Sequence, residues 1–206
     1  NQVNLGTRQP HSSSQISLDD LAFVRAITDK TVVYQGEPIL LRLRIYELDQ
    51  YHVHLQTPRN LSLPETEGFY SSRQWQQRLS EQYQGKPYRI TEINQVLYPA
   101  MPGELTIGAW QWRGAVRWSD DRRRPQTRVR IFTTNPITIN VQPLPPQPPD
   151  FHGAVGKFSM HATLSENNLV QGKPVRLIVT ISGQGNPNTI GAPEFPELPW
   201  AHVSDP

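Results

Sequence analysis

The chain has 206 residues, a length that allows one large domain or two modest ones. Its 20 prolines are about twice the average share, and because proline is excluded from helix interiors, a helical bundle or a coiled coil is ruled out. The formal net charge of +2 requires no acidic partner for the chain as a whole, and without cysteine the sequence has no disulfide, thiol nucleophile or thiolate metal site.

The first predicted element follows a polar tail of residues 1–15. No stretch approaches 18 uninterrupted apolar residues and the tail lacks the order of a signal peptide, so neither a membrane span nor a signal peptide is expected in this chain. Ser17-x-x-Asp20 ahead of Leu21 could cap a helix. We nevertheless predict a strand over residues 19–28, because their counterpart later in the chain, residues 158–164, alternates with period two.

The strongest local pattern is a strand that follows a turn. After Gly36 and Pro38, apolar residues alternate with arginines, as in a strand with one buried face; these apolar residues are Ile39, Leu41, Leu43 and Ile45. The pattern returns 136 positions later, where the identical pairs are Gln35/Gln171, Gly36/Gly172, Pro38/Pro174, Leu41/Leu177 and Ile45/Ile181. A repeat of this length predicts two copies of one domain rather than a solenoid or a propeller.

Two hairpins are predicted inside the first copy. Residues 75–83 and 88–97 flank the turn sequence Gln84-Gly85-Lys86-Pro87. Residues 118–128 would form an exposed hairpin tip before Val129 and Ile131.

An irregularity is predicted between these hairpins. Leu105 and Ile107 place apolar residues at odd positions, whereas after Gly108 the apolar residues occupy the even positions 110, 112, 116 and 118. A bulge at Gly108 or Ala109 would bring both sets onto one face, because one extra residue reverses the facing of a strand.

Proline also marks the domain boundary. Residues 143–149 contain five prolines and favour a semi-rigid polyproline II spacer, directly after an alternating strand at residues 137–141. We therefore expect a domain at 16–142, a linker at 143–150 and the incomplete start of a second domain at 151–206. Many short strands separated by turns predict an all-β fold of immunoglobulin-like antiparallel β-sandwiches, although the Cys…Trp…Cys pattern of antibody domains is absent.

Motifs that could carry chemistry are weak. His52-x-His54 would place two imidazoles on one face of a strand, but no third ligand is identifiable and no metal is expected. The glycines of residues 182–187 fit a turn or bulge at a strand end better than a phosphate loop, because Pro187 and later prolines prevent the helix that such a loop needs. No nucleophile motif or carboxylate pair is defined by spacing, so no catalytic residue, cofactor or enzyme activity is expected.

The only basic concentration is residues 113–130, where seven arginines lie beside three tryptophans. Such a set could bind single-stranded nucleic acid, but we expect no nucleic acid and favour a solvated tip in which Asp120 and Asp121 pair with arginines. The strand pattern assigns the tryptophans to the interior; facing outward, they would form a platform for sugar stacking. The candidate binding surface consists of Trp110, Trp112, Trp118, Arg122, Arg123 and Arg124.

Motifs in both copies resemble one family. Tyr34-Gln35-Gly36-Glu37-Pro38, Leu97-Tyr98-Pro99 and residues 103–107 are similar to the middle part of BatD, the oxygen-tolerance (aerotolerance-operon) protein. The second copy has that family's order of Gly-Ala-Val-Gly-x-Phe at 153–158, Gly-x-Pro at 172–174 and Gly-x-Gly-Asn at 183–186. The resemblance covers about residues 22–206.

The resemblance implies a periplasm-facing array of immunoglobulin-like domains, anchored in the inner membrane by a C-terminal helix. The resemblance also implies that the protein functions together with a MoxR-type ATPase and with membrane proteins that contain von Willebrand A domains. It supplies no catalytic residue, and the motif residues are interpreted as structural, for tight turns and strand starts. They are Gly36, Pro38, Gly153, Gly156, Gly172, Pro174, Gly183 and Gly185.

Two functions are therefore considered. The first is a non-enzymatic, extracytoplasmic interaction module of a membrane-anchored protein linked to oxygen and stress tolerance, which would scaffold von Willebrand A-domain partners. The alternative is carbohydrate or cell-wall binding by the tryptophan cluster. Because an incomplete sandwich leaves strand edges unpaired, residues 158–206 are expected either to pack on the first domain or to pair with another chain.

Overall fold

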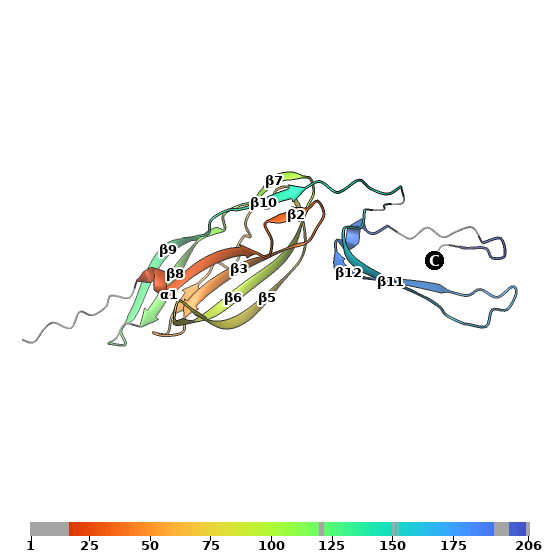
Figure 1. Cartoon of the computed structure of the whole chain (residues 1–206). Helices are drawn as coiled ribbons and strands as arrows, with labels where there is room; N and C mark the ends of the chain where they lie inside the picture. The colour runs from red at the N-terminus through yellow and green to blue at the C-terminus, as the bar shows by residue number, and fades with distance from the viewer. Residues whose placement is uncertain (1–16, 120–121, 150, 152, 192–197, 205–206) are drawn as a thin grey trace, which may run out of the picture.

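The computed structural model describes residues 17–119, 122–149, 151, 153–191 and 198–204. The described part of the chain is all-β, with a sandwich in residues 22–142 and a separate hairpin after it. Figure 1 shows this hairpin, β11 (Gly156–Leu164) and β12 (Leu177–Gly185), beyond the end of the sandwich at which β2, β7 and β10 lie. The predicted polar tail at 1–15 lies outside the described residues.

One layer of the sandwich is a four-stranded antiparallel sheet in the order β1-β3-β6-β5. Its strands are β1 (Ala22–Thr28), β3 (Ile39–Leu48), β6 (Lys86–Pro99) and β5 (Phe69–Tyr83). The opposite layer consists of two three-stranded sheets in the orders β2-β10-β7 and β4-β8-β9. These strands are β2 (Val32–Tyr34), β10 (Ile137–Gln142), β7 (Gly103–Ile107), β4 (His54–Gln56), β8 (Gln111–Ser119) and β9 (Pro125–Thr133).

A single hydrophobic core joins the two layers. The alternating residues of β3 predicted to face inward are all buried, and Leu41 and Ile39 are fully inaccessible. The opposite layer contributes Trp110, Trp112 and Phe132 to the same cluster. The predicted all-β sandwich is therefore confirmed, with β2–β10 as a parallel pair among otherwise antiparallel ones.

The start of the first strand differs from its prediction. Residues 18–21 form one helical turn, α1 (Leu18–Leu21), and β1 begins only at Ala22. The Ser17 side chain accepts a hydrogen bond from the Asp19 N–H at 3.2 Å, so the capping signal is real. The period-two counterpart at 158–164 carried no information about these residues, because at the shift of 136 it is equivalent to residues 22–28.

The β5–β6 hairpin is confirmed and is longer than predicted. Its turn is Gln84-Gly85, with φ of 50° and 75°, the left-handed geometry of a two-residue turn that follows the twist of the strands. Lys86 and Pro87 already belong to β6. The predicted linker contains no helix or strand in its described residues 143–149, and β10 ends at Gln142, the predicted end of the first domain.

The predicted bulge is a break between β7 and β8. Residues 108–110 leave the strand, yet Ile107 and Trp110 are both buried, so the facing reverses as expected. Thr134 closes the break, because it donates its N–H to the Trp110 carbonyl at 3.0 Å and accepts the Trp110 N–H on its hydroxyl at 2.9 Å.

The internal repeat is present in the hydrogen-bonded register. Ala22 pairs with Glu47 across β1 and β3; a shift of both by 136 gives Phe158 and Gly183, which pair across β11 and β12. The loops that join the strands also match. The Asp29 N–H donates to the Leu40 carbonyl, as the equivalent Ser165 N–H donates to that of Arg176.

The turns of the two copies are also the same. Gly36 and Gly172 have φ of +77° and +79°, a conformation that glycine adopts without strain. In each turn the residue after the glycine donates its N–H to the carbonyl three residues earlier: Glu37 to Tyr34, and Lys173 to Val170. The two segments are therefore copies in conformation as well as in sequence.

The copies differ in what covers them. The second hairpin has one apolar face, formed by Met160, Ala162, Leu164, Leu177, Val179 and Ile181. Met160 is 66% exposed and Leu177 45% exposed. The base of the hairpin contacts the sandwich, but the apolar face is exposed in the described residues and does not pack on it. The other half of the expectation, pairing with another chain, stays a prediction.

Candidate functional site

The tryptophan platform is not formed. Trp110 and Trp112 are 1% and 7% exposed, and Trp118 is half-buried against the same core. The break at residues 108–110 turns the even positions of β8 inward, which supports the interior assignment and contradicts a flat surface of three rings. The carbohydrate-binding alternative therefore loses the surface on which it rested.

The buried rings are held by specific neighbours. Trp110 donates its indole Nε1–H to the Ser62 carbonyl at 2.9 Å. The Trp112 ring stacks on Phe132 with centroids 4.6 Å apart. Gly114 leaves room for that ring, because a Cβ at this position would lie 2.4 Å from Trp112 Cζ3 and 2.9 Å from the Gln56 carbonyl oxygen.

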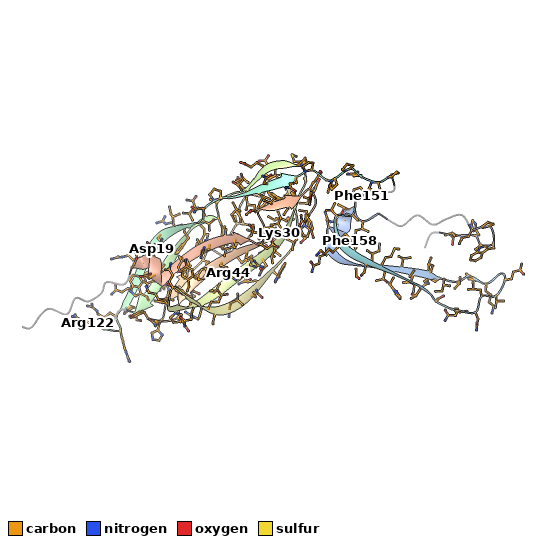
Figure 2. The ribbon with its side chains drawn as sticks, in the orientation of Figure 1. Asp19, Lys30, Arg44, Arg122, Phe151 and Phe158 are labelled. Carbon is orange, nitrogen blue, oxygen red and sulfur yellow. The ribbon has the colours of Figure 1, made fainter. Side chains whose placement is uncertain are left out.

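The arginines of the β8–β9 tip, Arg122 to Arg124, are the basic part of the candidate binding surface, and their role in binding stays a prediction. Arg122 and Arg124 each interact with a neighbouring group, and Arg123 occupies a turn position with φ of +58°. Further along β9, Arg130 forms an ion pair with Asp19 at 2.6 Å. The predicted pairing of Asp120 and Asp121 with arginines lies outside the described residues. Figure 2 shows Arg122 and Asp19 at the end of the sandwich far from the hairpin.

The two histidines do not share the face of a strand. Tyr51 and His52 have φ of 57° and 51°, so His52 lies in a left-handed turn, and only His54 belongs to β4. Arg89 stabilises this turn, because it donates a hydrogen bond to the Val53 carbonyl at 2.6 Å and forms an ion pair with Asp49 at 3.2 Å. The described residues contain no group of three or more His, Cys, Asp or Glu side chains that could hold a metal ion.

Two of the motifs that resemble BatD, at residues 153–158 and 183–186, meet at the base of the second hairpin. The Phe158 ring lies across β12 over two glycines: a Cβ at Gly183 would approach Phe158 Cδ1 to 2.7 Å, and one at Gly185 would approach its Cζ to 2.2 Å. Gly156 faces β12 in the same way, with only 2.1 Å between its ideal Cβ position and the Gln184 carbonyl oxygen. Glycine is therefore required wherever the aromatic ring and the two strands come closest.

A compact turn closes this base. Asn186 is buried, and its side chain accepts a hydrogen bond from the Asn188 N–H at 3.1 Å in η1 (Pro187–Thr189). Gly153 lies against this turn, since its ideal Cβ would be 3.1 Å from the Thr189 carbonyl oxygen. The glycine run predicted as a turn or bulge is instead the regular end of β12, and the turn follows at Pro187.

The same base contacts the sandwich. The Tyr98 hydroxyl donates to the Gly185 carbonyl oxygen at 3.2 Å. The ideal Cβ position of Gly36 is 3.5 Å from Val155, so the glycine turn of the first copy packs on the start of the second. Figure 2 shows Phe158 at this junction, at the end of the hairpin nearest the sandwich.

A polar group in the first sheet was missed by sequence reasoning. Glu92 is 2% exposed and accepts hydrogen bonds from Arg44 and from Gln77, the latter at 2.7 Å; Arg44 also pairs with Glu81 at 3.2 Å. Burial raises the pKa of the Glu92 carboxyl, but the hydrogen bonds from Gln77 and Arg44 outweigh burial and hold this pKa below its usual value. The only sequence signal was an arginine and a glutamate at outward positions of two predicted strands.

Neither a scan against protein-family models nor a search of curated proteins finds a match to this chain. None of the helices in the described ranges is long and apolar enough to cross a membrane.

Proposed function

We propose that the chain is a non-enzymatic, extracytoplasmic protein-interaction module of a BatD-like, membrane-anchored protein linked to oxygen and stress tolerance. Its partners would be the von Willebrand A-domain membrane proteins that act with a MoxR-type ATPase. The observation that carries the proposal is the arrangement of the three motifs that resemble the family, which lie at the two ends of one hairpin. Gly-Ala-Val-Gly-x-Phe and Gly-x-Gly-Asn build one junction, and Gly-x-Pro forms the turn at the other end of the hairpin.

The arrangement of surfaces supports an interaction role. The junction rests on Tyr98 and Gly36, so the sandwich serves as a support from which the second hairpin projects. The hairpin presents apolar side chains such as Met160 and Leu177 to solvent, and exposed apolar surface of this kind marks sites where other proteins bind. Loops and sheet edges on a rigid scaffold are the usual places for such binding.

Direct binding to the expected partners tests this proposal. The purified 206-residue chain would be immobilised and offered each von Willebrand A-domain protein encoded beside its gene. We expect saturable retention of at least one of them, and an unrelated β-sandwich domain of similar size serves as the control surface. Failure to retain any of these partners, with the chain folded as judged by the fluorescence of its buried tryptophans, would contradict the proposal.

A further inference from the structure

One edge of β12 has no neighbouring strand in the described part of the chain. In the described residues β12 pairs only with β11, so the edge opposite β11 has no strand beside it. In the first copy the equivalent edge of β3 is filled by β6 along its whole length, from Ile39↔Leu97 to Leu48↔Tyr88. Unpaired strand edges are templates for a further strand.

From this difference we infer that β12 accepts an antiparallel strand from a partner polypeptide, in the position that β6 occupies beside β3. The inference deepens the proposed function and rests on it, because it names the kind of segment that the interaction module binds. The recognition mode is addition of a strand to a sheet edge, where main-chain hydrogen bonds give affinity and alternate side chains give specificity.

The repeat fixes the register of the incoming strand. Shifted by 136, the pairs of β3 with β6 place the partner's inward side chains opposite Val175, Leu177, Val179 and Ile181. The equivalent positions of β6 are Leu97, Gln95, Ile93 and Thr91. Leu97 and Ile93 are apolar, whereas Gln95 and Thr91 are polar. Because the face of the hairpin that the new strand would extend is apolar, we expect the partner strand to carry apolar side chains at least at the positions of Leu97 and Ile93.

The same positions are buried in the first copy and exposed in the second. Ile39 and Leu41 are 0% exposed, whereas the equivalent Val175 and Leu177 are 39% and 45% exposed. The other face of the hairpin is largely polar, with Ser159 bonded to Ser182 across the two strands. A strand beside β12 would thus be recognised on one face by its apolar residues and would remain solvated on the other.

Charge adds a second element of recognition. Arg176 is exposed, and its equivalent in the first copy, Leu40, faces Val96 of β6. The partner residue at the Val96 position would therefore lie beside a guanidinium, where a carboxylate is favoured over an apolar side chain. The predicted partner strand is apolar at least at the inward positions of Leu97 and Ile93 and acidic at the outward position opposite Arg176.

A synthetic strand tests the inference on the intact chain. The probes are a peptide of the β6 sequence, Lys86–Pro99, and the same peptide with Val96→Glu. Amide exchange and chemical shifts of the isotopically labelled 206-residue protein would report where each peptide binds. We expect saturable protection of β12, tighter binding of the Val96→Glu peptide, and a loss of that advantage at high salt.

Matched variants decide whether the apolar face is used. Leu177→Glu places a charge on the inward face and should weaken binding by about tenfold or more, since a leucine side chain is covered by the strand. Thr180→Glu introduces the same charge on the opposite face of β12 and should leave peptide affinity within about twofold. Equal losses in both variants would contradict the inference.

Other results would also overturn it. These are no protection of β12 at peptide concentrations of about 1 mM, protection confined to the sandwich, or β12 already protected before peptide is added. Protection that depends on protein concentration would assign the edge to a second copy of this chain instead. Because the probe is a synthetic strand, failure here leaves retention of the von Willebrand A-domain partners as a separate result.

Discussion

The two copies of the strand–turn–strand unit share one conformation and differ in burial. β1 with β3 and β11 with β12 have the same register, the same loop hydrogen bonds and the same glycine turn. Yet Leu41 is 0% exposed and its identical counterpart Leu177 is 45% exposed. Local sequence therefore sets the pairing of the two strands, while burial depends on segments far away in the chain.

This difference separates two sources of stability. The first copy gains the hydrophobic effect of a core shared with Trp110, Phe132 and Leu97. The second relies on hairpin hydrogen bonds and on the packing of Phe158 over Gly183 and Gly185. Two-stranded hairpins are only marginally stable in water. Substitutions in the second copy should therefore change the opening of the hairpin alone, whereas substitutions in the first copy should change the unfolding of the whole sandwich.

The largest expected effect comes from truncating the identical leucines. Leu41→Ala should reduce the free energy of unfolding of the sandwich by about 2–5 kcal/mol, because it opens a cavity in a closed core. Leu177→Ala removes a half-exposed side chain and should cost less than about 1 kcal/mol. Urea unfolding followed by tryptophan fluorescence measures the first, and amide exchange of β12 measures the second. Equal costs would mean that the second copy is covered.

The next effect is expected at the hairpin base. Gly183→Ala would place a Cβ 2.1 Å from the Lys157 carbonyl oxygen, so the strands must separate or Phe158 must move. We expect faster amide exchange throughout β11 and β12 with no change in the melting of the sandwich. Gly172→Ala is the matched control, because that turn has free space and only its φ of +79° is strained, a cost of about 1 kcal/mol. A larger effect at Gly172 than at Gly183 would contradict this account of the motif.

A pH dependence should distinguish the copies. The pKa of Glu92 is lowered in the folded state, so its stabilisation is fully present above the unfolded value of 4.5 and is lost as pH falls through the folded pKa. Glu92→Gln should lose about 1–3 kcal/mol at neutral pH and should show a flatter fall in unfolding free energy below about pH 4.5. The hairpin has Thr180 at the position of Arg44 and therefore lacks the equivalent ion pair. Amide exchange of β11 and β12 should not show the pH-dependent stabilisation that Glu92 gives the sandwich. Parallel stability curves for the two proteins would refute the role of Glu92.

The smallest expected effect concerns an unpaired donor in the core. Trp112 Nε1 is buried with no hydrogen-bond partner, while its ring stacks on Phe132. Trp112→Phe removes that donor and keeps an aromatic ring, so the change in unfolding free energy should stay within about 1.5 kcal/mol. Trp110→Phe should cost more, since it also breaks the bond to the Ser62 carbonyl. Thermal melting of both variants orders them directly.

Much of the fold could be predicted because its signals are local. Period-two alternation located β3, and the Gln84-Gly85 turn located the β5–β6 hairpin. The reversal of facing at Gly108 correctly assigned Trp110 to the interior. The identities between the copies predicted that β11 and β12 would repeat the first pair, and the register agrees.

The failures come from features that sequence patterns do not encode. The turn of α1 is too short for any periodicity, and only the Ser17 cap indicated it. Nothing in the residue type announced the left-handed conformation of His52, which removed the shared face with His54. The bond between Arg44 and Glu92 depends on the register of two strands that are distant in the chain, and the uncovered face of β12 depends on which elements fold over it.

Residue-resolved amide exchange of equivalent pairs tests the central claim most directly. Leu41 with Leu177, and Ile45 with Ile181, are identical residues in the same register of the two copies. We predict that the amides of β3 exchange only through global unfolding, and that those of β12 exchange at least about 100-fold faster through local opening. Equal protection of both strands in the isolated chain would show that β12 is already covered and would contradict the account.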